Sequence, residues 1–352
     1  MLGNITETIP KFEYPENVIV IQVDDLIAAG IILPLSVVGL VMYMLFNIVA
    51  IMTREYRQNP YYLLAATLGF LDCITLVGMI FFCVPSILAH KAIGGHWVNV
   101  GFGSALIFGW YGGLPVIVCL AFNRYYCVCR REEYKLVFTI RNTKIMIGVC
   151  LVFGLFYGVF PWLNCCNYAF DVNYYGWAWN TAEQGGYIIN YVELCLTGLV
   201  VAIATLCNAK VFLTYKHMHK TMDTSADAKA EAVRREREFK LFVQFFIIVL
   251  WMTLFDAVFV AAPFISVSKW FVLLITIMYI IHCSINGYVY VFMNKKLRQR
   301  IFALISCNVP EETRVEAVSV VSRKRSTAKI SPAAFTIPTR KDTAKTEREQ
   351  PV

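Results

Sequence analysis

Four ionisable side chains interrupt the long apolar runs of the chain and are the first candidates for chemistry. Three are the carboxylic acids Asp72, Glu193 and Asp256, and the fourth is His282. An ionisable group at membrane depth costs roughly 2.5–3.5 kcal/mol on insertion scales and usually faces the interior of a helix bundle. Such groups serve binding, switching or proton and ion movement, so we expect the functional core of the protein around them.

The sequence offers little support for catalysis. No pairing of a nucleophile with a base stands out, and the nearest metal-like pair is His217 and His219. Helical residues two apart do not share a face, and no third ligand lies nearby in the sequence. The sequence therefore predicts no enzyme, no metal site and no cofactor.

Seven apolar runs must position these side chains. Hydrophobic residues make up 58% of the 352 residues and charged residues 16%, whereas a soluble domain has about 45–50% and about 25%. A transmembrane helix needs about 20 mostly apolar residues. The sequence thus predicts an all-α membrane protein with a seven-transmembrane helix bundle. The predicted spans are 26–52, 61–88, 97–122, 145–163, 187–213, 239–265 and 270–293.

The basic residues predict which side of the membrane each loop occupies. With the N-terminus outside, only Lys11, Lys91 and Lys269 of the 32 lysines and arginines fall on the outer side. Cytoplasmic loops carry the excess of lysine and arginine in membrane proteins. We expect a multi-pass protein of the plasma membrane with a cytoplasmic C-terminus. The net charge of +8 then reflects topology and does not indicate a nucleic-acid partner.

The regions outside the spans carry three further expectations. Residues 1–25 are expected to form an extracellular segment with a glycosylation sequon at Asn4. Residues 294–307 alternate apolar and basic side chains as an amphipathic eighth helix on the lipid surface, and Cys307 is a palmitoylation candidate. Residues 308–352 have the composition of a disordered cytoplasmic tail. The sixth span is expected to extend as a helix into the cytoplasm by two or three turns before residue 239.

Two polar groupings are expected inside the bundle. Asn47, Asp72 and Asn286 all fall in the inner half of their spans and could share one cluster. Asp256 and His282 lie at depths that differ by about 5 Å, at 1.5 Å per residue, on neighbouring helices. We expect these two to form an ion pair or hydrogen bond, with a merely satisfied core histidine as the alternative.

Two further contacts are left open by the sequence. Arg124, at the inner end of the third span, either snorkels to the surface or faces the bundle, where Glu238 is a candidate partner. Near the oxidising face, Cys83 could bridge to Cys165 or to Cys166, or all three could remain buried thiols.

Several motifs resemble those of the G-protein-coupled receptor superfamily. Asn47 resembles its first-helix asparagine and Asp72 its second-helix aspartate. Asn123-Arg124-Tyr125 is similar to its Asp-Arg-Tyr triplet, and Asn286-Gly287-Tyr288-Val289-Tyr290 to its Asn-Pro-x-x-Tyr motif. The correspondence covers residues 26–305.

Nematode serpentine chemoreceptors of class x are a closer match. The run of residues 120–125, the second outer loop from Phe160 to Trp179 and the sixth-helix entry at residues 235–244 are similar to theirs. The chain departs from the superfamily at Asn99, where a cysteine usually forms a disulfide to the second outer loop. It also lacks the Trp-x-Pro element of the sixth helix.

The resemblance implies a two-state receptor. An extracellular ligand stabilises one helix arrangement, and the inner face then activates a heterotrimeric G protein. The residues implied in coupling or activation are Arg124, Tyr125, Glu238, Asn286, Tyr290, Asn47 and Asp72.

Helix periodicity and the aromatic outer loop predict the ligand pocket. The expected ligand-binding side chains are Leu106, Ile107, Trp110, Tyr111, Trp177, Trp179, Asp256, Thr276, Tyr279 and His282, with Phe170, Tyr174 and Tyr175 as further loop contributors. Packing or an interfacial belt is the alternative for about half of these aromatics.

The class of ligand is constrained only through the resemblance. Leu106 stands where an amine receptor has its aspartate, and Ile280 stands where an opsin has its retinal lysine. A small odorant-like ligand is therefore expected, with a peptide as the alternative. A transporter or channel is a distant alternative, because the chain lacks paired repeats.

Overall fold

The computed structural model describes residues 22–52, 59–220, 228–262, 268–293, 298–299 and 301–302. Among these residues, seven helices are long and apolar enough to cross a membrane. This confirms the predicted all-α class and the number of spans. The spans are α1 (Val23–Met52), α3–η1–α4 (Pro60–Leu88), α5 (Gly95–Cys129), α7–η2 (Ile140–Trp162), α8 (Gln184–Lys220), α9 (Ala228–Ala261) and α10 (Lys269–Met293).

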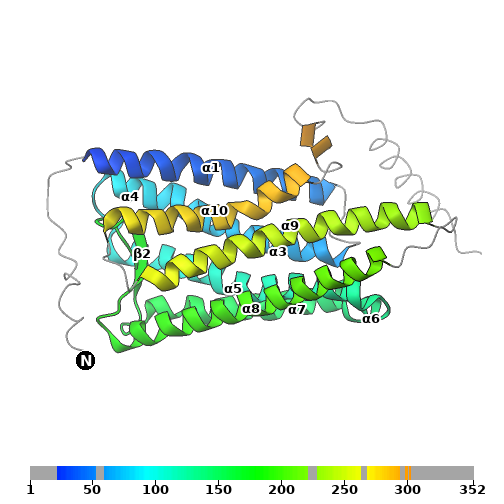
Figure 1. Cartoon of the computed structure of the whole chain (residues 1–352). Coiled ribbons are helices and arrows are strands. Elements are labelled where there is room, and N and C mark those ends of the chain that lie inside the picture. Colours follow the sequence, from blue (N-terminus) through cyan, green and yellow to red (C-terminus); the bar gives the residue numbers. More distant parts are fainter. Residues whose placement is uncertain are drawn as a thin grey trace, which may run out of the picture. The chain divides into compact units, whose positions relative to one another are not determined.

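The helices run side by side along one direction, with a short hairpin at one end and the helical turn α6 (Arg131–Val137) at the other (Figure 1). We call these the hairpin end and the Arg124 end, after the arginine that lies near α6. The α5 helix is central, because it contacts α3, α7, α8 and α9.

A close backbone approach joins α5 to α7. A Cβ atom on Gly154 would lie 2.9 Å from the Cα of Gly112 and 2.7 Å from the carbonyl oxygen of Phe108. Only a residue without a side chain fits there. Membrane helices commonly approach through such small residues, because their association depends on close packing.

The second span changes its winding on the way to the hairpin end. It begins as α3 (Pro60–Gly78), widens into the π turn η1 (Met79–Cys83) and continues as α4 (Val84–Leu88). Pro85 is the second residue of α4, two residues after the π turn, and a proline cannot donate the i→i−4 hydrogen bond of an α-helix. The wider turn places Phe82 and Cys83 in the core beneath the hairpin.

The hairpin consists of β1 (Tyr168–Asp171) and β2 (Gly176–Trp179), an antiparallel pair in which Phe170 lies opposite Trp177. It packs onto α5 at Gly103, where an added Cβ would clash with the carbonyl oxygen of Tyr168. The turn residue Tyr175 has a left-handed backbone with φ of 58°. A bulky residue adopts this conformation only where surrounding contacts hold it.

Helix ends differ from the predicted spans mainly towards the Arg124 end. The α5 helix runs on to Cys129, so Arg124 lies within a helix. The α9 helix begins at Ala228, which confirms the predicted extension of the sixth span. The sequon at Asn4, Cys307 and most of 294–307 lie outside the described residues, and the division into 1–25, 26–293, 294–307 and 308–352 stays a prediction.

Candidate ligand cavity and signalling cluster

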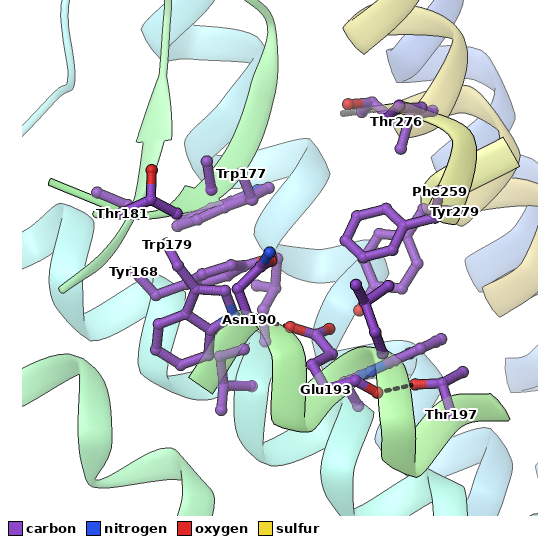
Figure 2. Close-up of a pocket in the computed structure, with 18 of the residues that line it drawn as sticks. Tyr168, Trp177, Trp179, Thr181, Asn190, Glu193, Thr197, Phe259, Thr276 and Tyr279 are labelled. Atoms are coloured by element: carbon purple, nitrogen blue, oxygen red, sulfur yellow. Dashed lines mark hydrogen bonds between the residues drawn. The ribbon is translucent and has the colours of Figure 1, made fainter. Parts of the chain in front are cut away.

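A cavity of about 750 Å³ lies beneath the hairpin. Side chains of α5, α8, α9 and α10 form its walls, and both strands of the hairpin contribute to its lining. Figure 2 shows Trp177 and Trp179 of the hairpin on one side, Phe259 and Tyr279 on the other, and Glu193 pointing between them. Its size falls within the range of small-molecule sites, about 300–1,000 Å³.

Two carboxylic acids of the membrane spans line this cavity. Glu193 of α8 is buried, and its Oε2 accepts a hydrogen bond of 2.7 Å from Trp179 Nε1. Asp256 of α9 also lines the cavity, and its buried Oδ2 has no hydrogen-bond partner among the described residues. The described part of the lining contains no lysine or arginine.

Eight of the ten predicted ligand-binding side chains line the cavity. They are Leu106, Ile107, Trp110, Trp177, Trp179, Asp256, Thr276 and Tyr279. Tyr111 does not; it is fully buried and stacks on Tyr157 at 3.9 Å between ring centroids. His282 lies beyond the cavity in a small crevice next to Asp72. Ligand binding by all ten stays a prediction.

Some aromatic residues of the second outer loop line the cavity and others do not. Phe170, Tyr174 and Tyr175 are absent from the described cavity lining. Phe170 packs in the core with Phe82 and Trp177, and Tyr175 anchors the turn. Phe255, Phe259 and Asn190 also line the cavity, although the sequence did not predict them as ligand-binding residues. Glu193 is the carboxylic acid of the fifth apolar run, and it is the feature of the sequence that could have predicted that α8 lines the cavity.

The predicted pairing of Asp256 with His282 is wrong in this structure. Asp256 Oδ2 and His282 Nδ1 are both buried without a hydrogen-bond partner among the described residues. The His282 ring instead packs against Trp110 and Phe255, at 5.5 and 5.9 Å between centroids. Matching depth did not ensure contact, because rotation about each helix axis also decides which side chains meet.

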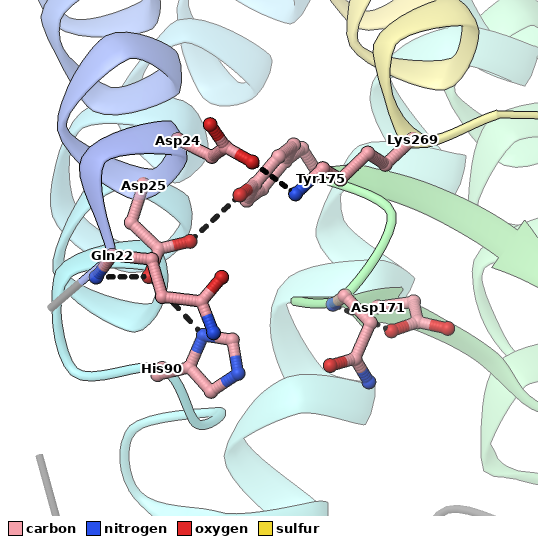
Figure 3. Close-up of polar contacts among 8 residues, drawn as sticks. Gln22, Asp24, Asp25, His90, Asp171, Tyr175 and Lys269 are labelled. Carbon is pink, nitrogen blue, oxygen red and sulfur yellow. Dashed lines mark hydrogen bonds and ion pairs between the residues drawn. The ribbon is translucent and has the colours of Figure 1, made fainter. Parts of the chain in front are cut away.

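A polar network fixes the hairpin to the start of α1 (Figure 3). Asp25 is fully buried; its Oδ1 accepts a 2.7 Å hydrogen bond from the Tyr175 hydroxyl, and its Oδ2 lies 3.2 Å from His90 Nδ1. Thr276 of α10 donates to the Tyr175 carbonyl oxygen at 2.8 Å. Burial and the hydrogen bond to Asp25 raise the pKa of Tyr175. Nearby, Lys269 forms an ion pair with Asp24.

Asn99 holds the hairpin against α5 without a covalent bond. Its Nδ2 donates to the Phe170 carbonyl oxygen at 3.0 Å, and its Oδ1 accepts from the Phe170 N–H at 2.8 Å. The side chain is 1% exposed. The resemblance drawn from the sequence implies that Asn99 stands where the superfamily usually has a cysteine bridged to this loop. In this structure a pair of hydrogen bonds connects Asn99 to the loop.

The three cysteines near this end are free thiols. Cys83 Sγ accepts a hydrogen bond from Trp177 Nε1 at 3.2 Å, and neither Cys165 nor Cys166 is bonded to it. Burial raises the pKa of the Cys166 thiol to about 11. A thiol with that pKa is mostly protonated at neutral pH and is a poor nucleophile. Among the described cysteines, Cys83 therefore forms no bridge.

Asp72 centres a second network, deeper in the bundle. It accepts a hydrogen bond from the Tyr43 hydroxyl, and Asn286 Nδ2 lies 3.5 Å from the same carboxyl oxygen. The predicted Asp72–Asn286 contact is present. Tyr43 of α1 takes the place expected for Asn47, whose amide lies one turn further on, near Gly69.

Trp110 and Tyr279 connect the cavity to this network. Both line the cavity, and both also line the crevice that reaches Asp72 and His282. Their rings meet edge to face at 5.5 Å. The Tyr279 hydroxyl lies 3.3 Å from Thr75 Oγ1. A ligand that moved either ring would therefore disturb the surroundings of Asp72.

Arg124 is buried at the other end of the bundle, which excludes the snorkelling alternative. It is 8% exposed, and its guanidinium lies 3.7 Å from the centroid of the Tyr61 ring. Its Nε and Nη2 atoms have no hydrogen-bond partner among the described residues. Tyr290 packs edge to face on Tyr61 at 6.1 Å.

Two further residues implied in coupling, Tyr125 and Glu238, belong to the same end of the bundle as Arg124 in the sequence. Tyr125 packs with Val128 and Phe242 in a small core between α5, α8 and α9. The side chain of Glu238 lies outside the described residues, so its pairing with Arg124 stays a prediction.

The described chain has seven spans, a covered cavity at one end and Arg124 packed on Tyr61 at the other, an arrangement compatible with a G-protein-coupled receptor. A model of the serpentine type seven-transmembrane chemoreceptor family Srx matches residues 33–294. The chain belongs to this family, and it is a multi-pass membrane protein.

Two similar proteins come from squid. The chain is 29% identical over 90 residues to retinochrome of Todarodes pacificus, a match that spans 24% of this chain and 30% of retinochrome. The crystal structure of squid rhodopsin superposes with a TM-score of 0.68 at 15% identity, covering 91% of this chain and 98% of that one. This likeness supports the rhodopsin-type arrangement of the helices.

Proposed function

We propose that the protein is a chemosensory receptor of the plasma membrane that binds a small extracellular molecule and activates a heterotrimeric G protein. The supporting observation is a series of contacts that leads from the cavity to Asp72 and Asn286 and resumes one helical turn further on, between Tyr290, Tyr61 and Arg124. Trp110 and Tyr279 border both the cavity and the crevice at Asp72, and Asn286 and Tyr290 lie one turn apart on α10.

The proposed orientation has the hairpin end outside and the Arg124 end in the cytoplasm. The excess of lysine and arginine on the Arg124 side supports it. So does the cavity, which lies at the hairpin end of the bundle, where an extracellular ligand would bind. Glycosylation of an epitope-tagged chain at Asn4, removed by Asn4→Gln, tests the orientation.

The cavity favours a small molecule over a peptide. Most of its described lining is aromatic or aliphatic, and the hairpin strands cover it instead of opening a groove for an extended chain. The described lining also has no lysine, and the fully buried Ile280 stands where an opsin has its retinal lysine. A Schiff-base photopigment is therefore disfavoured.

Arg124→Ala tests the coupling role. Cells that express the full chain with a G-protein reporter are screened with small volatile and water-soluble compounds. The variant should lose the evoked signal, by about tenfold or more, while its surface expression persists. Arg130→Ala, an exposed arginine six residues further along, is the matched control and should respond like the wild type. A full response from Arg124→Ala would contradict the proposal.

A further inference from the structure

Glu193 and Asp256 line one cavity whose described residues include no lysine or arginine to neutralise them. They come from different helices, α8 and α9, and both line the cavity. A buried carboxylate is costly unless it is paired or hydrogen-bonded. Trp179 supplies one hydrogen bond to Glu193, and Asp256 Oδ2 has none among the described residues. His96, a histidine of the lining, is exposed and packs against Trp97.

The aromatic rings around these acids are also suited to a cation. Trp110, Trp177, Trp179, Tyr168 and Tyr279 all line the cavity. The face of an aromatic ring attracts a cation by about 0.5–2 kcal/mol, and indole rings do so best. Inorganic ions would leave most of the cavity empty, because its volume is about 750 Å³.

We propose that the ligand is an organic ammonium ion with an apolar body, seated with its positive charge between Glu193 and Asp256. The inference rests on the proposed receptor function and names the class of its ligand. The position of Leu106 in the third span argued against an amine, since an amine receptor has its aspartate there. The structure brings two acids to the same cavity from other helices, so binding an amine there does not require an aspartate at position 106.

The first arm of the test is direct binding to the purified full-length protein in lipid nanodiscs. Phenethylamine, isoamylamine and benzyltrimethylammonium are compared with phenethyl alcohol and isoamyl alcohol, the neutral counterparts of the two primary amines. Melting temperature and tryptophan fluorescence report occupancy, since Trp110, Trp177 and Trp179 line the cavity. We expect saturable binding of at least one ammonium compound, about tenfold or more tighter than the alcohols.

Asp256→Asn and Glu193→Gln should each weaken that binding by about tenfold or more. Both replacements keep the shape of the side chain, and the amide oxygen that Glu193→Gln introduces can still accept from Trp179. Glu183→Gln removes a carboxylate from the exposed stretch before α8 and should bind like the wild type. In the empty protein, removal of either cavity acid should shift the melting temperature upward, because an unneutralised buried charge is lost.

The outcomes separate the two proposals. Binding of alcohols as tight as that of amines, no binding of any ammonium compound, or undiminished binding by both acid variants overturns the ammonium ligand. If a neutral compound evokes a signal that is lost in Arg124→Ala, the ammonium ligand is overturned and the receptor function is supported. Ammonium binding without any G-protein response would support the ligand class and count against coupling.

Discussion

The contacts that hold the hairpin and the contacts of the buried Arg124 differ in how completely their polar groups are paired. At the hairpin end, the Asp25 carboxylate meets Tyr175 and His90, and the Asn99 amide pairs with both backbone groups of Phe170. At the Arg124 end, the guanidinium has two buried nitrogens, Nε and Nη2, without a hydrogen-bond partner among the described residues.

This difference separates a part that is fixed from a part that can change partners. Fully satisfied polar networks specify one arrangement, whereas a buried donor without an acceptor costs about 1–3 kcal/mol. A second arrangement that supplied acceptors to Arg124 would recover that energy. We infer that the hairpin end defines the shape of the binding site and that the Arg124 end supplies the switch.

The largest expected effect is at Asn99. Asn99→Ala leaves the buried N–H and carbonyl of Phe170 without partners, at a cost of about 1–3 kcal/mol each. The melting temperature of the purified chain should fall by several degrees, at about 2–4 °C per kcal/mol for a domain of this size. Asn173→Ala, on the exposed hairpin turn, is the control. Equal melting temperatures for the two variants would contradict the anchoring role of Asn99.

A smaller loss of stability is expected at Asp25. Asp25→Ala removes the acceptor of the Tyr175 hydroxyl but also removes a buried carboxylate, so the net cost should be about 1–3 kcal/mol. Limited proteolysis within the hairpin should accelerate in parallel with the fall in melting temperature. A variant as protease-resistant as the wild type would show that the hairpin does not depend on α1.

At the Arg124 end, the same kind of change should hardly affect stability. Arg124→Leu replaces an incompletely paired buried charge with an apolar side chain, a change that is often neutral or stabilising. We expect a melting temperature equal to or above that of the wild type, together with loss of signalling. A destabilisation as large as that of Asn99→Ala would remove the contrast between the two ends.

The smallest effect concerns alkaline pH. Because the pKa of Tyr175 is raised in the folded state, its contribution to stability is fully present below the unfolded pKa of about 10 and is lost as pH rises above it. The melting temperature of wild type minus that of Tyr175→Phe should be constant below about pH 9 and decrease above about pH 10. A difference that does not change with pH would mean that the hydroxyl is not held by Asp25.

The number and the approximate bounds of the membrane spans could be predicted from the sequence because they depend on the order of apolar and charged residues along the chain. Apolar length predicted the seven spans, and the mixed-charge run before residue 239 predicted the extension of α9. The Asp72–Asn286 contact followed from depth and from the superfamily motif. The helix periodicity of α5 placed Leu106, Ile107 and Trp110 correctly on the cavity wall.

The side-chain contacts inside the bundle could not be predicted, because they depend on the rotation of each helix about its axis and on partners that are distant in the sequence. Asp256 and His282 matched in depth, yet they face different neighbours. Tyr43 displaced Asn47 from the Asp72 network because the packing of α1 against α3 decides which turn reaches the carboxylate. The hairpin was missed although Tyr168–Asp171 and Gly176–Trp179 flank a turn with an asparagine. The role of Asn99 required its partner, 71 residues away.

The π turn at Met79–Cys83 has a consequence for how such receptors diverge. A π turn accommodates one more residue than an α turn, so it absorbs the rotation of about 100° that an extra residue would otherwise impose on everything beyond it. Deleting one residue within Met79–Cys83 should therefore close the bulge into an ordinary α turn and leave the side chains of α4 facing the same neighbours. In a regular α-helix the same deletion would turn the far end of the span by about 100°, so this bulge is the place where the second span tolerates a change in length.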